Sequence, residues 1–120
     1  MNKAQLSLFV FGLYMVFAVG LALVLIPFPI LNLFGLSAGD GLWIRFVGML
    51  ASLLGVYYVL AARAGMNRFI AWTVGMRFYA AAFMVFMVLL GGAGPGLLLF
   101  AAIDSAAATW TWLALRSPHQ

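Results

Sequence analysis

The chain lacks most of the residue types from which polar active sites are built. It has no cysteine and no glutamate, and its only acidic residues are Asp40 and Asp104. Without cysteine there are no disulfides, thiolate metal sites or thiol nucleophiles. The single histidine, His119, and two separated aspartates cannot supply the convergent ligands that a metal ion needs. We therefore expect no metal site and no catalytic motif, while acid–base chemistry by Asp104 alone stays open.

Charge of either sign is also scarce. Only 7% of the 120 residues are charged and 68% are hydrophobic, whereas a soluble domain averages about 25% charged and 45–50% apolar residues. The six basic residues are scattered and form no stripe, which argues against nucleic acid as a partner. The composition is that of an integral membrane protein, with membrane lipids as its immediate partners.

Four apolar runs are long enough to cross the ~30 Å hydrocarbon layer of a bilayer. They cover residues 6–26, 43–62, 69–90 and 97–115. Pro27 and Pro29 end the first run, because proline lacks an amide donor. Residues 30–36 are apolar but too short to cross, and they predict an interfacial turn. Short loops make successive helices antiparallel, so residues 1–120 are expected to form one all-α, up-down-up-down bundle of four transmembrane helices.

The basic residues predict the orientation of this bundle. Lys3, Arg63, Arg68 and Arg116 all fall on one side of a topology with four spans. Loops rich in lysine and arginine stay in the cytoplasm. We therefore expect a multi-pass protein of the inner membrane with both termini cytoplasmic.

Two charges interrupt the third and fourth runs near their centres. Arg77 lies nine residues past Arg68, and Asp104 lies nine residues past Pro95. At 1.5 Å per residue each is ~14 Å into its span, from opposite sides. A charge at this depth costs ~2.5–3.5 kcal/mol and usually faces a protein interior with a partner. Since the two spans should be neighbours, we expect a buried Arg77–Asp104 ion pair or a ligand site around it.

Arg45, just inside the second span, is the third charge of this constellation. Its side chain can either extend to the interface or turn inward toward Asp104. Hydroxyl groups could add to the lining of a central site, and the candidates are Tyr14, Ser52, Thr73 and Ser105.

Small residues indicate which helix faces pack together, because close approach of backbones drives helix association in lipid. Gly48, Ser52 and Gly55 form such a stripe on the second span. Ala71 and Gly75 begin one on the third. Both stripes are expected to face other helices.

The four spans, the basic side and the stretch RFVGMLASLLG at residues 45–55 together resemble the DoxX-like group of small bacterial membrane proteins. The resemblance covers the layout of most of the chain. It implies a four-helix bundle and, as in some members, association with quinone-linked membrane oxidoreductases.

Three interpretations of the central charges stay open. The pair could simply hold the bundle together and select its register. With Arg45 it could instead line a pocket for a lipid or a quinone. Alternatively, Asp104 could carry a proton in coupled transport of a small molecule. We expect an accessory subunit of a membrane complex or a binder of a lipophilic ligand, either in a larger complex or as a homo-oligomer, with proton-coupled transport as the alternative.

Overall fold

The computed structural model describes residues 1–92 and 94–116, so His119 lies outside the described residues. It contains four helices that are long and apolar enough to cross a membrane: Lys3–Leu25, Leu42–Ala64, Asn67–Leu89 and Leu97–Leu115. Each end lies within three residues of the predicted end. The described residues contain no strand. The expected all-α architecture with four candidate spans is confirmed.

The first span is a composite of three helical segments, α1 (Lys3–Leu13), the π-helix η1 (Tyr14–Leu21) and α2 (Ala22–Leu25). It begins at a capping box, in which Asn2 and Gln5 each accept the other's backbone N–H through their side chains. This exchange satisfies two amide donors that a helix start leaves unpaired. The span ends at Ile26, whose backbone departs from helical geometry.

The chain then folds back as a short helix, α3 (Pro27–Leu33), with proline at its start. Proline suits this position because its fixed φ matches the helix and its missing N–H is not needed there. The predicted turn at 30–36 is therefore part of a longer segment that begins earlier. Leu31 of α3 is buried. The ring of Phe34, just after α3, packs edge-on against Phe100 of the fourth span at 5.1 Å between centroids.

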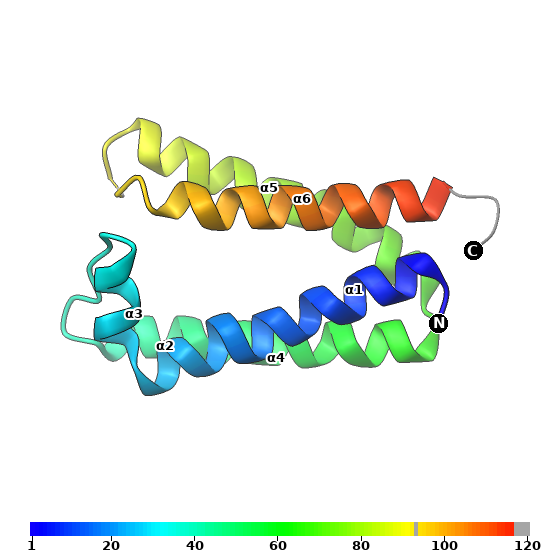
Figure 1. Ribbon diagram of the computed structural model, residues 1–120, viewed down its shortest axis with the longest axis horizontal. Helices are drawn as coiled ribbons and strands as arrows, with labels where there is room; N and C mark the ends of the chain where they lie inside the picture. Colours follow the sequence, from blue (N-terminus) through cyan, green and yellow to red (C-terminus); the bar gives the residue numbers. More distant parts are fainter. Residues whose placement is uncertain (93, 117–120) are drawn as a thin grey trace.

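The remaining helices are α4 (Leu42–Ala64), α5 (Asn67–Leu89) and α6 (Leu97–Arg116). The first span lies along α4, and α5 lies along α6, so the bundle consists of two antiparallel pairs (Figure 1). The pairs meet at the end that holds the start of α1, the turn at Gly65 and the end of α6. We call this the narrow end. They separate toward the other end, the wide end, where α3 lies between them.

The hydrophobic core occupies the narrow end. Its buried members come from all four spans and are Ala4, Leu8, Phe11, Tyr58, Ala61, Ala62, Ile70 and Ala114. Two polar contacts join the helices there. The hydroxyls of Ser7 and Thr111 lie 2.6 Å apart and connect α1 to α6. Gln5 Nε2 donates to the Ala62 carbonyl at 2.8 Å and connects α1 to α4.

Glycines bring the first span and α4 into backbone contact. A Cβ added at Gly55 would lie 2.7 Å from the Gly12 carbonyl oxygen, and one at Gly12 would lie 2.8 Å from the Gly55 carbonyl oxygen. A Cβ at Gly48 would likewise lie 2.8 Å from the carbonyl oxygen of Gly20. These separations are too short for any side chain. The predicted packing role of Gly48 and Gly55 is confirmed, and their partners are the glycines of the first span.

The small residues of α5 behave differently. Ala71 and Gly75 are exposed, and a Cβ at Gly75 would meet nothing within 4 Å. The prediction that this stripe faces another helix is wrong for these two residues. The contact of α5 with α6 uses a different face, on which Val74, Arg77 and Ala81 are buried.

Arg45 neither extends freely to the interface nor turns inward toward Asp104. It is exposed at the wide end, where Nε donates to the Val24 carbonyl at 3.0 Å. Its guanidinium carbon lies 6.0 Å from the centre of the Phe28 ring. A helix interrupted by proline leaves carbonyls unpaired, and a cation near a helix C-terminus also favours the helix dipole. Arg45 therefore caps the first span and is not directed toward Asp104.

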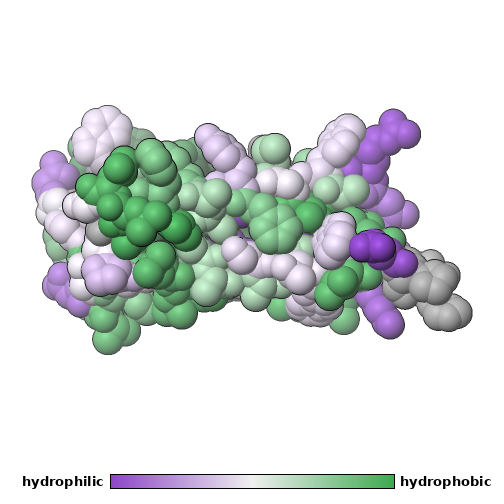
Figure 2. Space-filling view, turned by 90° about the horizontal axis from the view of Figure 1, so that it is seen from above, coloured by the Kyte–Doolittle hydropathy of each residue, from purple (hydrophilic) through white to green (hydrophobic). Residues whose placement is uncertain are grey.

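On the face shown in Figure 2, hydrophilic side chains gather at the two ends, and the surface between them is mostly apolar. Many large apolar side chains are exposed, among them Phe17, Leu60 and Phe83. Exposed apolar surface of this extent marks contact with a partner or a membrane. Together with the length of the helices, it fits a multi-pass membrane protein.

We predict that Gly55→Ala weakens the fold, because the added methyl group meets backbone atoms that cannot rotate away. The expected loss is about 1–3 kcal/mol. Gly75→Ala is the matched control, and it should be neutral or stabilising by up to about 1 kcal/mol because alanine favours helix. Unfolding of both variants in mixed micelles of dodecylmaltoside and dodecyl sulfate measures the difference. Equal stability of Gly55→Ala and the parent chain would contradict the glycine packing.

Candidate functional site: an apolar cavity with a single carboxylate

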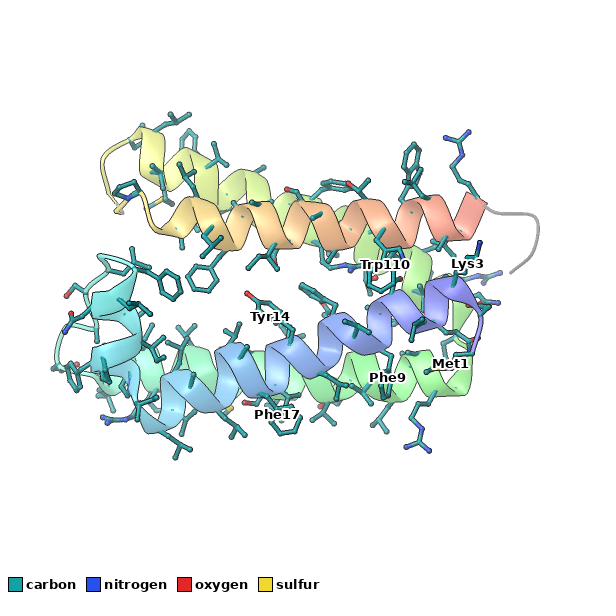
Figure 3. The ribbon with its side chains drawn as sticks, in the orientation of Figure 1. Met1, Lys3, Phe9, Tyr14, Phe17 and Trp110 are labelled. Atoms are coloured by element: carbon teal, nitrogen blue, oxygen red, sulfur yellow. The ribbon has the colours of Figure 1, made fainter. Side chains whose placement is uncertain are left out.

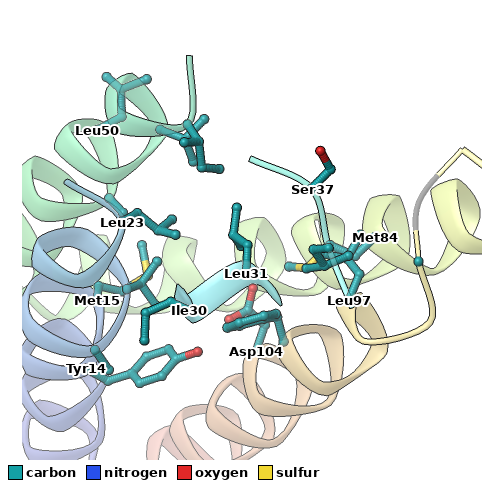
Figure 4. Close-up of a pocket in the computed structure, with 18 of the residues that line it drawn as sticks. Tyr14, Met15, Leu23, Ile30, Leu31, Ser37, Leu50, Met84, Leu97 and Asp104 are labelled. Carbon is teal, nitrogen blue, oxygen red and sulfur yellow. The ribbon is translucent and has the colours of Figure 1, made fainter. Parts of the chain in front are cut away.

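A cavity of about 740 Å³ lies between the two helix pairs, in the half of the molecule toward the wide end. Its volume is within the ~300–1,000 Å³ range of small-molecule sites. The walls are almost entirely aliphatic (Figure 4). Contributions come from the first span, α3, α4, α5 and α6, and include Met15, Leu23, Leu31, Leu50, Met84 and Leu97.

Asp104 is the only charged side chain among the described residues that line this cavity. It projects from α6, and the phenol of Tyr14 reaches toward it from the first span (Figure 4). Figure 3 shows Tyr14 extending toward the α5–α6 pair, while Phe17 extends away on the opposite side of the same span. The polar side chains of the described lining are thus this carboxylate with the phenol beside it, and Ser37 in the segment after α3.

The π-helix η1 provides much of the wall next to this polar part. Tyr14, Met15, Ala18 and Val19 all belong to it and all line the cavity. A π-helix has a wider turn than an α-helix, and such segments occur frequently at functional sites. Four residues within six positions of this segment reach the cavity. Nothing in the sequence indicated this segment.

Arg77 is buried, with 3% of its surface exposed, and it does not line the cavity. Its Nε donates to the Thr73 carbonyl at 3.3 Å and one terminal nitrogen donates to Thr73 Oγ1 at 3.2 Å. The guanidinium carbon lies 5.0 Å from the centre of the Phe11 ring, a cation–π contact. The other terminal nitrogen, NH1, is buried without a hydrogen-bond partner.

The expected direct ion pair between Arg77 and Asp104 is not formed. Among the described residues, no arginine or lysine nitrogen lies within 4 Å of a carboxylate oxygen. Helical side chains lean toward the N-terminus of their own helix. In antiparallel helices this takes Arg77 toward the narrow end and Asp104 toward the wide end. Two residues at similar depth therefore place their charged groups apart.

The remaining predicted lining residues are mostly elsewhere. Of the four hydroxyl candidates, only Tyr14 lines the cavity. Ser52 donates to the Gly48 carbonyl within α4, and Thr73 holds Arg77. Ser105 lies on a separate shallow groove of the α5–α6 pair. The aliphatic lining was not predicted, because any residue of an apolar span can face lipid, another helix or a cavity.

This arrangement limits the chemistry of the site. The described residues contain no group of three metal-ligating side chains. The carboxylate can accept hydrogen bonds, carry a proton or hold a cation. The phenol can donate one hydrogen bond. Such a site can bind a molecule that has an apolar body and a small polar group.

Comparison with protein-family models, with curated proteins and with solved structures finds no match for the chain. The resemblance to DoxX-like proteins thus stays a prediction from the sequence. Any function must therefore be inferred from the cavity and the residues around it.

We predict that Thr73→Val destabilises the protein, because it removes the hydroxyl acceptor of a buried guanidinium that already has one unpaired nitrogen. The expected loss is about 1–3 kcal/mol. Thr109→Val is the control, since Thr109 is exposed and bonds only to the Ser105 carbonyl of its own helix. The control should stay within about 0.5 kcal/mol of the parent chain. Unfolding in detergent measures the stability of both variants. Equal losses of stability would show that Thr73 does not hold Arg77.

Proposed function

We propose that the protein binds a lipophilic molecule in the cavity, with the polar group of that molecule at Asp104 and Tyr14. The observation that carries this proposal is the cavity itself, which is large, mostly aliphatic and charged at one place only in its described lining. Ligand sites commonly combine apolar walls with a few convergent polar groups. An ionisable residue inside a membrane span is also a functional candidate by default.

The position of the cavity suggests how such a molecule enters. Val47, Leu50 and Leu54 of α4 line the cavity and are also exposed. The cavity is therefore open along this part of α4, on the apolar surface of the molecule. A ligand dissolved in the bilayer could enter from the side without passing through water. A lipid or a quinone has the required combination of apolar chain and small polar group.

The membrane placement that we propose rests on the basic residues. Lys3, Arg63, Arg68 and Arg116 belong to helix ends or turns at the narrow end. Under the positive-inside rule this end faces the cytoplasm of an inner membrane. The cavity then lies in the outer half of the bilayer. A protein with such a site could also act as an accessory subunit of a larger membrane complex.

Filling the cavity should abolish binding. Ala18 lines the cavity, so we predict that Ala18→Phe occupies the space of a ligand. The probe is dodecanol with a photoreactive diazirine at the end opposite the hydroxyl, applied to the protein in phosphatidylcholine nanodiscs. Saturable labelling of cavity residues, mapped by mass spectrometry, should fall at least about tenfold, as expected for a loss of 1.4 kcal/mol or more.

Ala102→Phe is the matched control, because Ala102 is exposed on α6 and does not line the cavity. It should label like the parent chain. Labelling that does not saturate in the parent chain, or that survives Ala18→Phe unchanged, would contradict a binding cavity.

Proton-coupled transport is the second candidate. One observation favours it: Asp104 faces an open cavity and has no direct ion-pair partner among the described residues. A carboxylate in this position can exchange a proton with a passing substrate. We predict for this candidate that Asp104→Asn abolishes proton movement driven by a substrate gradient in proteoliposomes, while the variant still inserts and folds. Unchanged proton flux in that variant would exclude Asp104 as the proton carrier.

A further inference from the structure

We propose that the polar group recognised by the cavity is a cation, and that the ligand class is a single-chain lipophilic ammonium. Its ammonium would lie at the Asp104 carboxylate and its alkyl chain along the aliphatic walls. This inference rests on the proposed binding function and specifies the chemistry of its ligand. It is carried by the charge, the aromatic surroundings and the shape of the cavity.

The first argument is charge complementarity. Asp104 is half-buried and supplies the only charge in the described cavity lining. Arg77 leans toward the narrow end, where Thr73 and Phe11 hold its guanidinium. A carboxylate removed from water and lacking a direct partner is costly unless it binds a proton or a cation. The described cavity lining supplies no cation, so a ligand that brings one can contact the carboxylate directly.

The second argument concerns the ligands that the site disfavours. An anionic head group such as a fatty carboxylate would face Asp104 with like charge, and no basic side chain lines the described cavity to compensate. Like charges at close range strongly disfavour each other's ionised form. A neutral alcohol can donate one hydrogen bond to the carboxylate. An ammonium group has up to three donors and adds the attraction between opposite charges.

The third argument is the presence of two aromatic side chains in the described cavity lining, one of them beside the carboxylate. Tyr14 approaches Asp104 from the first span (Figure 4). Phe100 precedes Asp104 by one helical turn on α6 and also lines the cavity. Ammonium groups are attracted to the faces of such rings. A cavity with one acidic group and two aromatic rings is suited to an ammonium, and it has no comparable attraction for an anion.

The shape of the cavity accommodates a single chain. Leu31 of α3 and Met84 of α5 contribute to the aliphatic wall beyond the carboxylate. The exposed lining of α4, at Val47 and Leu54, continues this wall to the outer surface. A chain anchored at Asp104 can therefore run through the cavity and leave it into the bilayer.

The test is a competition series with three probes of equal chain length: dodecylammonium, dodecanol and dodecanoate. Each competes with the photoreactive dodecanol for saturable labelling in phosphatidylcholine nanodiscs, at a pH near neutral. We expect dodecylammonium to compete at a concentration at least about tenfold lower than dodecanol, because its charge is attracted to the carboxylate in addition to the hydrogen bond. Dodecanoate should be the weakest competitor.

Asp104→Asn keeps the size of the side chain and removes its charge. In this variant dodecylammonium should lose its advantage, while dodecanol still competes. Asp40→Asn is the matched control, because Asp40 is exposed in the loop before α4 and accepts a hydrogen bond from the Leu42 amide. This variant should keep the order of the parent chain.

The outcomes separate this inference from the proposed function. If dodecanol labelling saturates but the three competitors are equal, or dodecanoate is the strongest, the cavity binds lipophiles and the cation inference is overturned. If Asp104→Asn retains the preference for ammonium, Asp104 is not its recognition group and the inference is likewise overturned. If the photoreactive dodecanol does not label the parent chain saturably, both the proposed function and this inference fail.

Discussion

The arrangement of the molecule depends on the core that its helices share at the narrow end. There, small, aliphatic and aromatic residues of four spans form a continuous core, and the Ser7–Thr111 contact joins the two helix pairs. Within the first pair, Gly12 and Gly55 allow the two backbones to touch. Among the described residues, no comparable core holds the pairs together where α3 lies between them (Figure 1). The cavity lies where the two pairs diverge from this core. At the wide end the pairs are connected again by the segment after α3, where Phe34 and Gly35 contact Gly96 and Gly94.

The direction of side chains along antiparallel helices explains the polar part of this cavity. Arg77 and Asp104 come from neighbouring helices and lie at similar depths, yet each leans toward the start of its own helix. Arg77 thereby becomes part of the narrow end, where Phe11 and Thr73 offset the cost of its burial. Asp104 becomes part of the cavity. The same pair of charges thus serves two purposes, one in packing and one at the candidate binding site.

Much of the fold could be predicted from the sequence because its signals are local. Run length and hydropathy locate the spans, proline locates the end of the first one, and glycine spacing locates the contact face of α4. The π-helix and the position of α3 could not be predicted, since both depend on packing between distant segments. The exposed faces of Ala71 and Gly75 show the same limit: in lipid, a small residue has no preference for the interior unless a partner approaches it.

The candidate site was predicted in part. Its central residue, Asp104, and one neighbour, Tyr14, were recognisable as polar groups inside apolar runs. The separation of Asp104 from Arg77 could not be predicted. Helical rise gives the depth of a residue in its span and says little about the direction of its side chain. The role of Arg45 was also unpredictable, since the carbonyl that it caps is brought to it only by the break at Ile26.

The central claim is that Asp104 faces an apolar cavity and forms no direct ion pair with Arg77. Reaction with dicyclohexylcarbodiimide tests this directly, because this lipophilic reagent modifies protonated carboxyl groups in apolar surroundings. Mass spectrometry of the treated protein in nanodiscs should find modification at Asp104, reduced in Ala18→Phe, with Asp40 unmodified in the aqueous loop. An unreactive Asp104 that becomes reactive only when Arg77 is replaced by glutamine would show that the two residues are paired, and would contradict the account.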